Sequence, residues 1–282
     1  MSWPCFQSEM MKPFFRAIFY LYFLFVASSV VQADNIKEGN RLYDAGKYRE
    51  AMVYFMKPDA RENSEVINTV AYMYNHGLGI RRDSQQAFRW YRKAAEAGLP
   101  IAQFNLGLMY EQGNGTAKNL TEAVKWYRRA AEQCDAYAES KLGYLALSGT
   151  GIKKDYQEAM KWYRRAAEHG DKGAYADIGI MYARGRGVKK DLNHAVQYYI
   201  LGSQKGDAKA QSLLGSAYAY GKGIKQDTEM ALYWYKKAAL NGNINAMKEL
   251  GYIYETGRLG VQQDLQEARR WNDMARQAEE KQ

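Results

Sequence analysis

The sequence has few of the residues that build metal centres and disulfide frameworks. Its 282 residues include 2 cysteines, 3 histidines and 4 prolines. The histidines, His76, His169 and His194, stand in no HExxH or CxxC pattern, so the sequence predicts neither a metal site nor a cofactor. No Ser-x-x-Lys nucleophile pattern is present. These absences favour a protein that is held together by packing and is not an enzyme.

Long apolar runs are also scarce, and the single one lies near the start. Residues 17–31 are apolar, follow Lys12 and Arg16, and lead to a small-x-small site that ends at Ala33. This arrangement is typical of a secretory signal peptide, and the run is shorter than the roughly 20 residues of a membrane-spanning helix. We predict cleavage after Ala33 and a periplasmic protein, with an extracellular location as the alternative. Met1 and Met11 both remain candidate starts.

Export changes the charge and the cysteine content. Removal of residues 1–33 takes Lys12, Arg16 and Glu9 from 40 basic and 31 acidic residues, which leaves 38 and 30, a formal net charge of +8. Cys134 then stands alone and predicts no internal disulfide. Export argues against nucleic acid as the partner. The positive charge suits an acidic protein partner.

One motif recurs every 36 residues. The copies of its second half (WYRRAAEHG in one of them) begin at Trp90, Trp126, Trp162, Tyr198 and Trp234. A Gly-x-Gly precedes each copy, and a sixth copy has one extra residue between Gly257 and Gly260. Within the motif, apolar residues recur at i, i+3, i+4, i+7 and i+8, which is one face of a helix. A glycine in the first half, such as Gly107, allows a partner helix to approach closely. Each unit is therefore predicted to be two packed helices.

Stacked hairpins bury faces that no single hairpin can cover. We predict an all-α, right-handed α-solenoid of about seven stacked helix-turn-helix hairpins. The predicted organisation is a signal peptide at 1–33, a divergent helical hairpin at 34–63, about six repeats at 64–277, and a polar tail at 278–282. Trp126 and Trp162 are predicted to lie between helices. Three basic residues are predicted to pair with a glutamate four positions later, namely Arg92 with Glu96, Arg128 with Glu132, and Arg164 with Glu168.

The pattern A-x3-L-G-x2-Y-x2-G-x-G-V/I-x2-D-x3-A-x2-W-Y-x2-A-A resembles the Sel1-like repeat, a relative of the tetratricopeptide repeat. Departures are modest, such as Ala146 for the first-helix Tyr and Tyr198 for the Trp. The resemblance implies an adaptor that holds partner proteins. Exported bacterial members include signalling regulators, envelope assembly factors and immunity proteins against secreted toxins. A cysteine-rich subset is associated with binding or hydrolysis of penicillin-like compounds, but its paired cysteines are absent here.

The resemblance also suggests where a partner binds. By analogy with tetratricopeptide proteins, the first helix of each hairpin lines the concave side, and large side chains at variable positions are candidate anchors. The alternative is that they pack against the neighbouring first helix. The candidate partner-binding residues are Tyr72, His76, Phe104, Leu108, Gln112, Tyr144, Ile180, Arg184, Tyr220, Lys248 and Tyr252.

The stretch GRGVKKD at 185–191 is one of a series of loops, and it resembles a phosphate cradle only when taken alone. Its glycines follow a helix rather than a strand and no GK[ST] is present, so they are interpreted as turn residues. Stacking predicts a basic edge that orients the chain on an anionic partner or membrane surface. Its residues are Arg81, Arg82, Lys118, Lys153, Lys154, Lys189, Lys190 and Lys225.

The leading functional hypothesis is a non-enzymatic periplasmic binding module. Within it, an immunity protein that neutralises a secreted, lipase-like toxin of a type VI system stands beside an envelope scaffold or signalling regulator. The contrasting hypothesis, an enzyme that acts on cell-wall material or penicillin-like compounds, is the least favoured.

Overall fold

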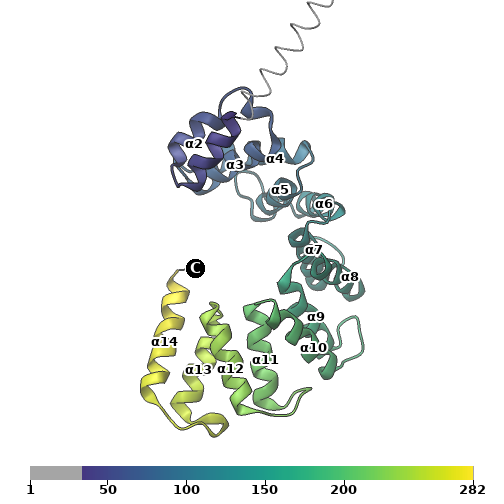
Figure 1. Cartoon of the computed structure of the whole chain (residues 1–282). Helices are drawn as coiled ribbons and strands as arrows, with labels where there is room; N and C mark the ends of the chain where they lie inside the picture. Colours follow the sequence, from purple (N-terminus) through teal and green to yellow (C-terminus); the bar gives the residue numbers. More distant parts are fainter. Residues whose placement is uncertain (1–33, 282) are drawn as a thin grey trace, which may run out of the picture. The chain divides into compact units, whose positions relative to one another are not determined.

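The structure is a computed structural model that describes residues 34–281; the predicted signal peptide at 1–33 lies outside the described residues. Within 34–281 the chain is helical with no strand, and helices follow one another in pairs (Figure 1), which confirms the predicted all-α solenoid of repeated hairpins. None of these helices combines the length and the apolar character needed to cross a membrane. The chain divides into two compact units, one ending at Asn119 and the other beginning at Leu120.

The first unit holds the divergent opening hairpin and the start of the repeats. Residues 34–44 are helical. The elements that follow are α2 (Tyr48–Phe55), the 3-10 turn η1 (Ala60–Glu62), α3 (Ser64–His76), α4 (Ser84–Glu96) and α5 (Pro100–Gln112). Leu42 and Phe55 share one core with Val66, Val70 and Met73 of α3. The opening hairpin is therefore packed onto the first repeat.

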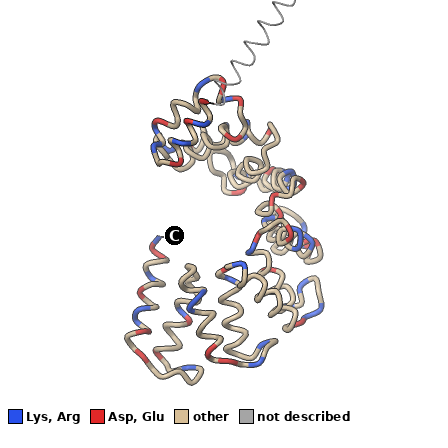
Figure 2. The backbone as a smooth tube through the Cα atoms, viewed as in Figure 1, with Lys and Arg blue, Asp and Glu red and all other residues tan. Residues whose placement is uncertain are grey.

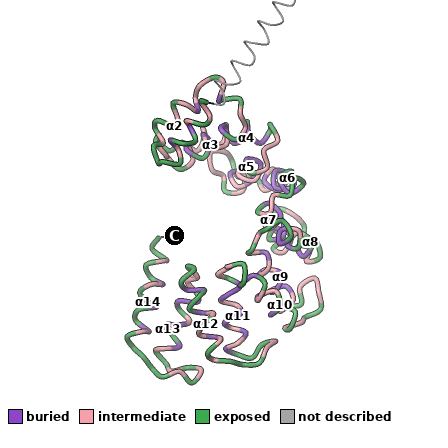
Figure 3. Tube along the Cα trace, viewed as in Figure 1, coloured by how far each residue is buried: buried purple, intermediate pink, exposed green. Residues whose placement is uncertain are grey.

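The second unit holds nine helices among the described residues. They are α6 (Leu120–Glu132), α7 (Ala136–Ser148), α8 (Tyr156–Glu168), α9 (Lys172–Arg184), α10 (Leu192–Gln204), α11 (Ala208–Tyr220), α12 (Thr228–Leu240), α13 (Ile244–Thr256) and α14 (Leu265–Glu280), with a 3-10 turn η2 (Arg258–Gly260) before the last. In Figure 1 the helices α11 to α14 stand side by side in chain order. Buried residues run along the facing sides of the helices (Figure 3).

The two helices of a hairpin meet through a glycine and a tyrosine. A Cβ atom on Gly143 of α7 would lie 2.9 Å from the ring of Tyr163 in α8, and one on Gly179 of α9 would lie 2.4 Å from the ring of Tyr199 in α10. Tyr163 is buried as a result. The prediction that the first-helix glycine permits close approach is confirmed, and the ring that fills the space is the tyrosine of the Trp-Tyr pair.

The tryptophans of these pairs lie nearer the surface than the tyrosines. Trp126 is buried at 6% exposure, whereas Trp162 is half-buried. A guanidinium covers each ring: the Cζ of Arg129 lies 4.6 Å from the centroid of Trp126, and the Cζ of Arg165 lies 4.9 Å from that of Trp162. The predicted interhelical position therefore holds for Trp126 and only in part for Trp162.

The predicted ion pairs along the second helices are mostly wrong. Arg92 pairs with Glu96 at 2.7 Å, as expected. Arg128 instead lies 3.9 Å from Glu158 of the next second helix, and Arg164 donates to the hydroxyl of Tyr182 at 3.3 Å. Contacts between neighbouring repeats thus replace contacts within one helix, because the next hairpin lies within reach of these long side chains.

The glycines of the Gly-x-Gly loops serve two different backbone needs. Gly185 ends α9 in the left-handed conformation at φ +65°, which glycine adopts without steric cost. Gly187 has φ +70°, and a Cβ on it would lie 2.5 Å from the carbonyl oxygen of Tyr156 at the start of α8. Asp191 then caps α10 by accepting from the His194 N–H at 3.0 Å. These contacts agree with the interpretation of the loop as a turn.

Candidate functional site

The candidate binding residues lie in repeated registers on the first helices. The residue that follows the first-helix glycine, or Ala71 in α3, recurs every 36 positions as Tyr72, Leu108, Tyr144, Ile180, Ser216 and Tyr252. A second register, which ends each first helix, contains His76, Gln112, Arg184 and Tyr220. Residues four apart on a helix share a face. In each of the two units, we call the surface formed by the predicted binding residues of that unit its first-helix face.

None of the eleven is buried. Phe104, Leu108 and Ile180 are half-buried, and the other eight are exposed. The exposed fractions of the tyrosines are 41% for Tyr72, 53% for Tyr144, 39% for Tyr220 and 47% for Tyr252. Rings of this size with so much open surface are candidate anchors for a protein partner.

The first-helix face of the first unit includes a small aromatic cluster. The rings of Tyr72 and His76 lie 4.1 Å apart at an interplanar angle of 37°. Both belong to the last two turns of α3, four residues apart. The unit also contributes the half-buried Phe104 and Leu108 from α5.

The second unit contains an arginine that sequence reasoning missed. The Cζ of Arg258 lies 5.6 Å from the ring centroid of Tyr220 and 5.3 Å from that of Tyr252, so one guanidinium contacts both rings. Lys222 adds a second cation at 5.1 Å from the Tyr220 ring. Lys222 and Arg258 stand 36 residues apart, each directly after the glycine that ends a first helix. This repeated basic position is the signal in the sequence that points to Arg258.

Lys248 is the candidate least available to a partner. Its Nζ lies 2.5 Å from a carboxylate oxygen of Glu279 in α14. Both side chains are about half-exposed, so the pair is a surface ion pair of modest strength. The last helix thus supplies an ion-pair partner to one of the predicted binding residues.

The residues of the predicted basic edge are all exposed. Figure 2 shows Lys and Arg in the loops that lead into the second helices. In the second unit these loops lie against preceding second helices: Gly187 against Tyr156, and Gly223 against Leu192. Lys154 also acts on its neighbour, because its hydrogen bond to the phenol lowers the pKa of Tyr156. The eight exposed residues are Arg81, Arg82, Lys118, Lys153, Lys154, Lys189, Lys190 and Lys225.

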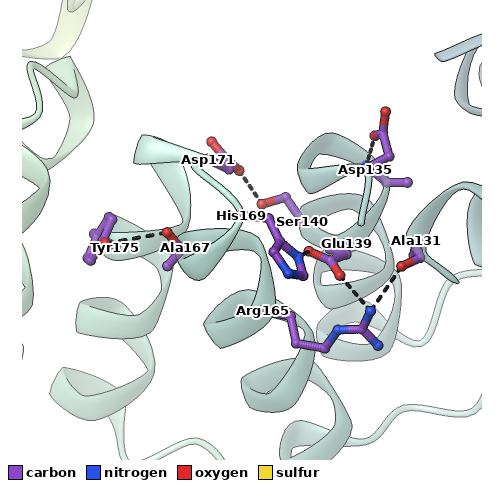
Figure 4. A network of polar contacts seen from close by, with 10 residues as sticks. Ala131, Asp135, Glu139, Ser140, Arg165, Ala167, His169, Asp171 and Tyr175 are labelled. Atoms are coloured by element: carbon purple, nitrogen blue, oxygen red, sulfur yellow. Dashed lines mark hydrogen bonds and ion pairs between the residues drawn. The ribbon is translucent and has the colours of Figure 1, made fainter. Parts of the chain in front are cut away.

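A polar network centred on the buried Glu139 lies between α7 and α8 (Figure 4). The carboxylate of Glu139 has no exposed surface, and its oxygens lie 2.8 Å from Arg165 and 2.7 Å from Nδ1 of His169. Arg165 also donates to the carbonyl of Ala131 at 2.9 Å, and the hydroxyl of Ser140 donates to Asp171. The contact between Glu139 and His169 joins residues 30 positions apart, and no motif in the sequence indicates it. The network therefore joins neighbouring helices around a carboxylate that has no exposed surface.

Chemistry elsewhere in the described part of the chain is sparse. Residues 34–281 hold no group of three or more His, Cys, Asp or Glu side chains placed to bind a metal ion. Cys134 is exposed and free. His194 is held by Asp191 at 2.7 Å and stacks on the ring of Tyr182. Aromatic and basic surface is what remains for function.

Comparison with known proteins assigns the family. The Sel1 repeat model matches residues 68–99, 100–133, 136–171, 173–207, 208–243 and 244–275. The chain therefore belongs to the Sel1 repeat family, whose fold mediates protein–protein interaction. None of the curated proteins matches it.

Several solved structures are similar. A Sel1 repeat protein from Oxalobacter formigenes is 64% identical with a TM-score of 0.83, and the match covers 86% of this chain and 99% of that one. The protective antigen c5321 of uropathogenic Escherichia coli is 32% identical with a TM-score of 0.73, over 87% of this chain and 53% of that one. The immunity protein Pa5087 of Pseudomonas aeruginosa shares the fold at 19% identity and a TM-score of 0.53, over 76% and 81% of the two chains.

Proposed function

We propose that this chain is an exported, non-enzymatic module that binds a partner protein on its first-helix face. The observation that carries the proposal is the exposed aromatic surface in repeated registers, with Arg258 held between Tyr220 and Tyr252. Tyr and Arg contribute most to the binding energy of protein interfaces. The family's role in protein–protein interaction points the same way.

The role we propose for the module is that of an immunity protein, which blocks a secreted, lipase-like toxin delivered by a type VI system. The net charge of +8 beyond residue 33 would complement an acidic toxin. Pa5087, which has the same fold, is an immunity protein, although likeness at that identity concerns the fold alone. An envelope scaffold or regulator would use the same face on a resident partner.

The basic edge has an accessory role in this proposal. Exposed lysines in consecutive loops raise the local positive potential and speed the encounter with an anionic protein or membrane. Reversing the charge of Lys153, Lys154, Lys189 and Lys190 should slow association and weaken its dependence on salt. Unchanged association at low salt would remove this role.

Capture from the native envelope fraction tests the proposal. The chain beginning at Asp34 serves as bait, and the same chain with Tyr144→Ala and Tyr252→Ala serves as the comparison. One partner retained by the bait and lost by the comparison supports the first-helix face. Equal capture by both would contradict it. A toxin encoded beside this chain favours the immunity role, and a resident envelope protein favours the scaffold role.

The export proposal has its own test. The chain produced with residues 1–33 should reach the periplasm and give a mature mass that begins at Asp34. A cytoplasmic product that retains residues 1–33 would contradict export.

A further inference from the structure

One register of the first-helix face lacks a large side chain. The residue after the first-helix glycine is Tyr144 in α7, Ile180 in α9 and Tyr252 in α13, but Ser216 in α11. Ser216 is partly buried, and its side chain is far smaller than those at the other three positions.

A pocket of about 170 Å³ lies at this position. Its walls come from three helices and the following loop, with Ala183 of α9, Leu192 and Tyr199 of α10, Leu213 and Ser216 of α11, and Lys222. Most of these side chains are apolar. A dry apolar cavity of about 150 Å³ takes up benzene, so this pocket has the size of one aromatic ring.

The next repeat shows what occupies the equivalent register. There Tyr252 presents its ring to the guanidinium of Arg258 at 5.3 Å. Lys222 is the residue equivalent to Arg258, since it precedes Arg258 by 36 positions. In the repeat of α11, however, Ser216 supplies no ring at this register. Lys222 therefore lies over one ring, that of Tyr220, whereas Arg258 lies over two.

The cations around this pocket are not neutralised by the described part of the chain. Among residues 34–281, no carboxylate forms an ion pair with Arg184, Lys222 or Arg258, and all three are exposed. Arg184 is close enough to lower the pKa of Tyr199 on the pocket wall, while burial, the larger effect, raises it to about 12. An apolar pocket with Lys222 on its wall and Arg184 near Tyr199 is complementary to an aromatic side chain beside a carboxylate.

We infer that the pocket at Ser216 receives an aromatic side chain from an acidic segment of the partner protein. The incoming ring takes the place that Tyr252 fills in the next repeat, and the neighbouring carboxylate pairs with Lys222 or Arg184. This inference rests on the proposed function, because it specifies the chemistry of the partner at the first-helix face.

The probe for this site is N-acetyl-Asp-Phe-amide, which carries one carboxylate beside one phenyl ring. N-acetyl-Asn-Phe-amide lacks the charge, and N-acetyl-Asp-Ala-amide lacks the ring. Each is titrated into the chain beginning at Asp34 while the backbone amide resonances are followed. The Asp-Phe probe should shift the amides of Ser216, Ala217 and Lys222 and should bind more tightly than both comparison peptides.

Ser216→Tyr and Lys222→Met test the location of the site, and Ser216→Ala is the control. Ser216→Tyr places the ring of the neighbouring register in the pocket and should weaken the Asp-Phe probe by at least about tenfold. Ser216→Ala keeps the pocket open and should retain binding. Lys222→Met changes only an exposed side chain, so it leaves the fold intact, and it should lower affinity to the level of the Asn-Phe peptide, about two- to fivefold weaker.

The inference is overturned if the Asp-Phe and Asp-Ala probes bind equally, if Ser216→Tyr binds like the unmodified chain, or if the shifts lie elsewhere. Self-association that Ser216→Tyr abolishes would make the occupant a second copy and overturn it as well. Binding of the purified partner separates the two proposals. If Tyr144→Ala and Tyr252→Ala weaken binding of the partner but Ser216→Tyr does not, the pocket is refuted and the first-helix face stands. If none of these variants weakens binding of the partner, the first-helix face is refuted.

Discussion

Nδ1 of His169 lies 2.7 Å from Oε2 of Glu139, a carboxylate with no exposed surface. Two other repeats have a glutamine at the position of Glu139. Gln103 and Gln211 each donate to the backbone carbonyl eight residues before them, at 3.2 and 3.3 Å. An ionised glutamate cannot donate. Arg165 therefore donates to the equivalent carbonyl of Ala131.

Because Arg165 here makes the bond that a glutamine makes in other repeats, the effects of substituting Arg165 and Glu139 should depend on each other. Arg165→Ala removes a donor and leaves the buried carboxylate with less compensation, so it should lower the free energy of unfolding by about 2–3 kcal/mol. Glu139→Gln in the same chain should recover part of that loss, because the glutamine can donate to Ala131 as Gln103 and Gln211 do to their carbonyls. Urea unfolding of the two single variants and the double variant measures the effect. Equal losses in Arg165→Ala and in the double variant would contradict the exchange.

A half-buried carboxyl of α9, that of Asp177, predicts a pH dependence. Burial raises the pKa of Asp177, and the lysine Lys209, whose Nζ lies 2.6 Å away, only partly offsets this. A carboxyl with a raised folded-state pKa binds its proton more tightly in the folded state, so its charge costs stability at neutral pH. That cost is relieved as the pH falls through the folded pKa toward the unfolded value of 3.8. Asp177→Asn should therefore melt slightly higher at neutral pH, and the difference should shrink on acidification.

Asp155 is the matched control for this experiment. The N–H of Glu158 lowers its pKa, so its charged form contributes stability above the unfolded pKa and loses it on acidification. Asp155→Asn should shift the melting temperature in the opposite sense to Asp177→Asn, or not at all. A rise at neutral pH for both variants would contradict the burial argument.

Cys134 carries backbone strain that its sister loops avoid. Its φ is +63°, a conformation that the equivalent Gly170 and Gly242 adopt without a side chain. Cys134→Gly should raise the free energy of unfolding by about 1 kcal/mol. Gly170→Ala, at a position with open space around it, should lower stability by a similar amount. Denaturant unfolding tests both, and a less stable Cys134→Gly would show that the thiol itself contributes.

The two rings of a Trp-Tyr pair should differ in their contribution to stability. Tyr163→Ala empties the space against Gly143 and should cost about 3–5 kcal/mol. Trp162→Ala removes a half-buried ring, whose Nε1 donates to Glu158 at 3.2 Å, and should cost about 1–2 kcal/mol. Equal costs in chemical unfolding would contradict the packing described above.

Sequence predicted what the repeat requires of every copy. The 36-residue period, the glycine at 143 and the turn glycine at 185 follow from backbone geometry and close helix packing, which are the same in each hairpin. The positions of Tyr144 and Tyr252 on an exposed stripe followed from the same helical register.

Sequence did not predict what one copy does differently from the next. Glu139 meets His169 across 30 residues, and Arg258 reaches Tyr220 across 38. Those contacts depend on how far long side chains extend between neighbouring hairpins, which no single register shows. The pocket at Ser216 was not predicted for a related reason: a small residue indicates a pocket only when the side chains that form its walls are known.

The affinity of the purified partner is the most direct test of the claim that the first-helix face binds it. Tyr144→Ala with Tyr252→Ala should weaken the complex at least about tenfold. Tyr233→Ala with Leu201→Ala removes comparably exposed side chains from second helices and should change the affinity by less than about twofold. Calorimetric titration of the partner into the unmodified chain and into each of the two double variants gives both changes in affinity. The reverse order, with the second-helix variant weakened and the first-helix variant unchanged, would contradict the account.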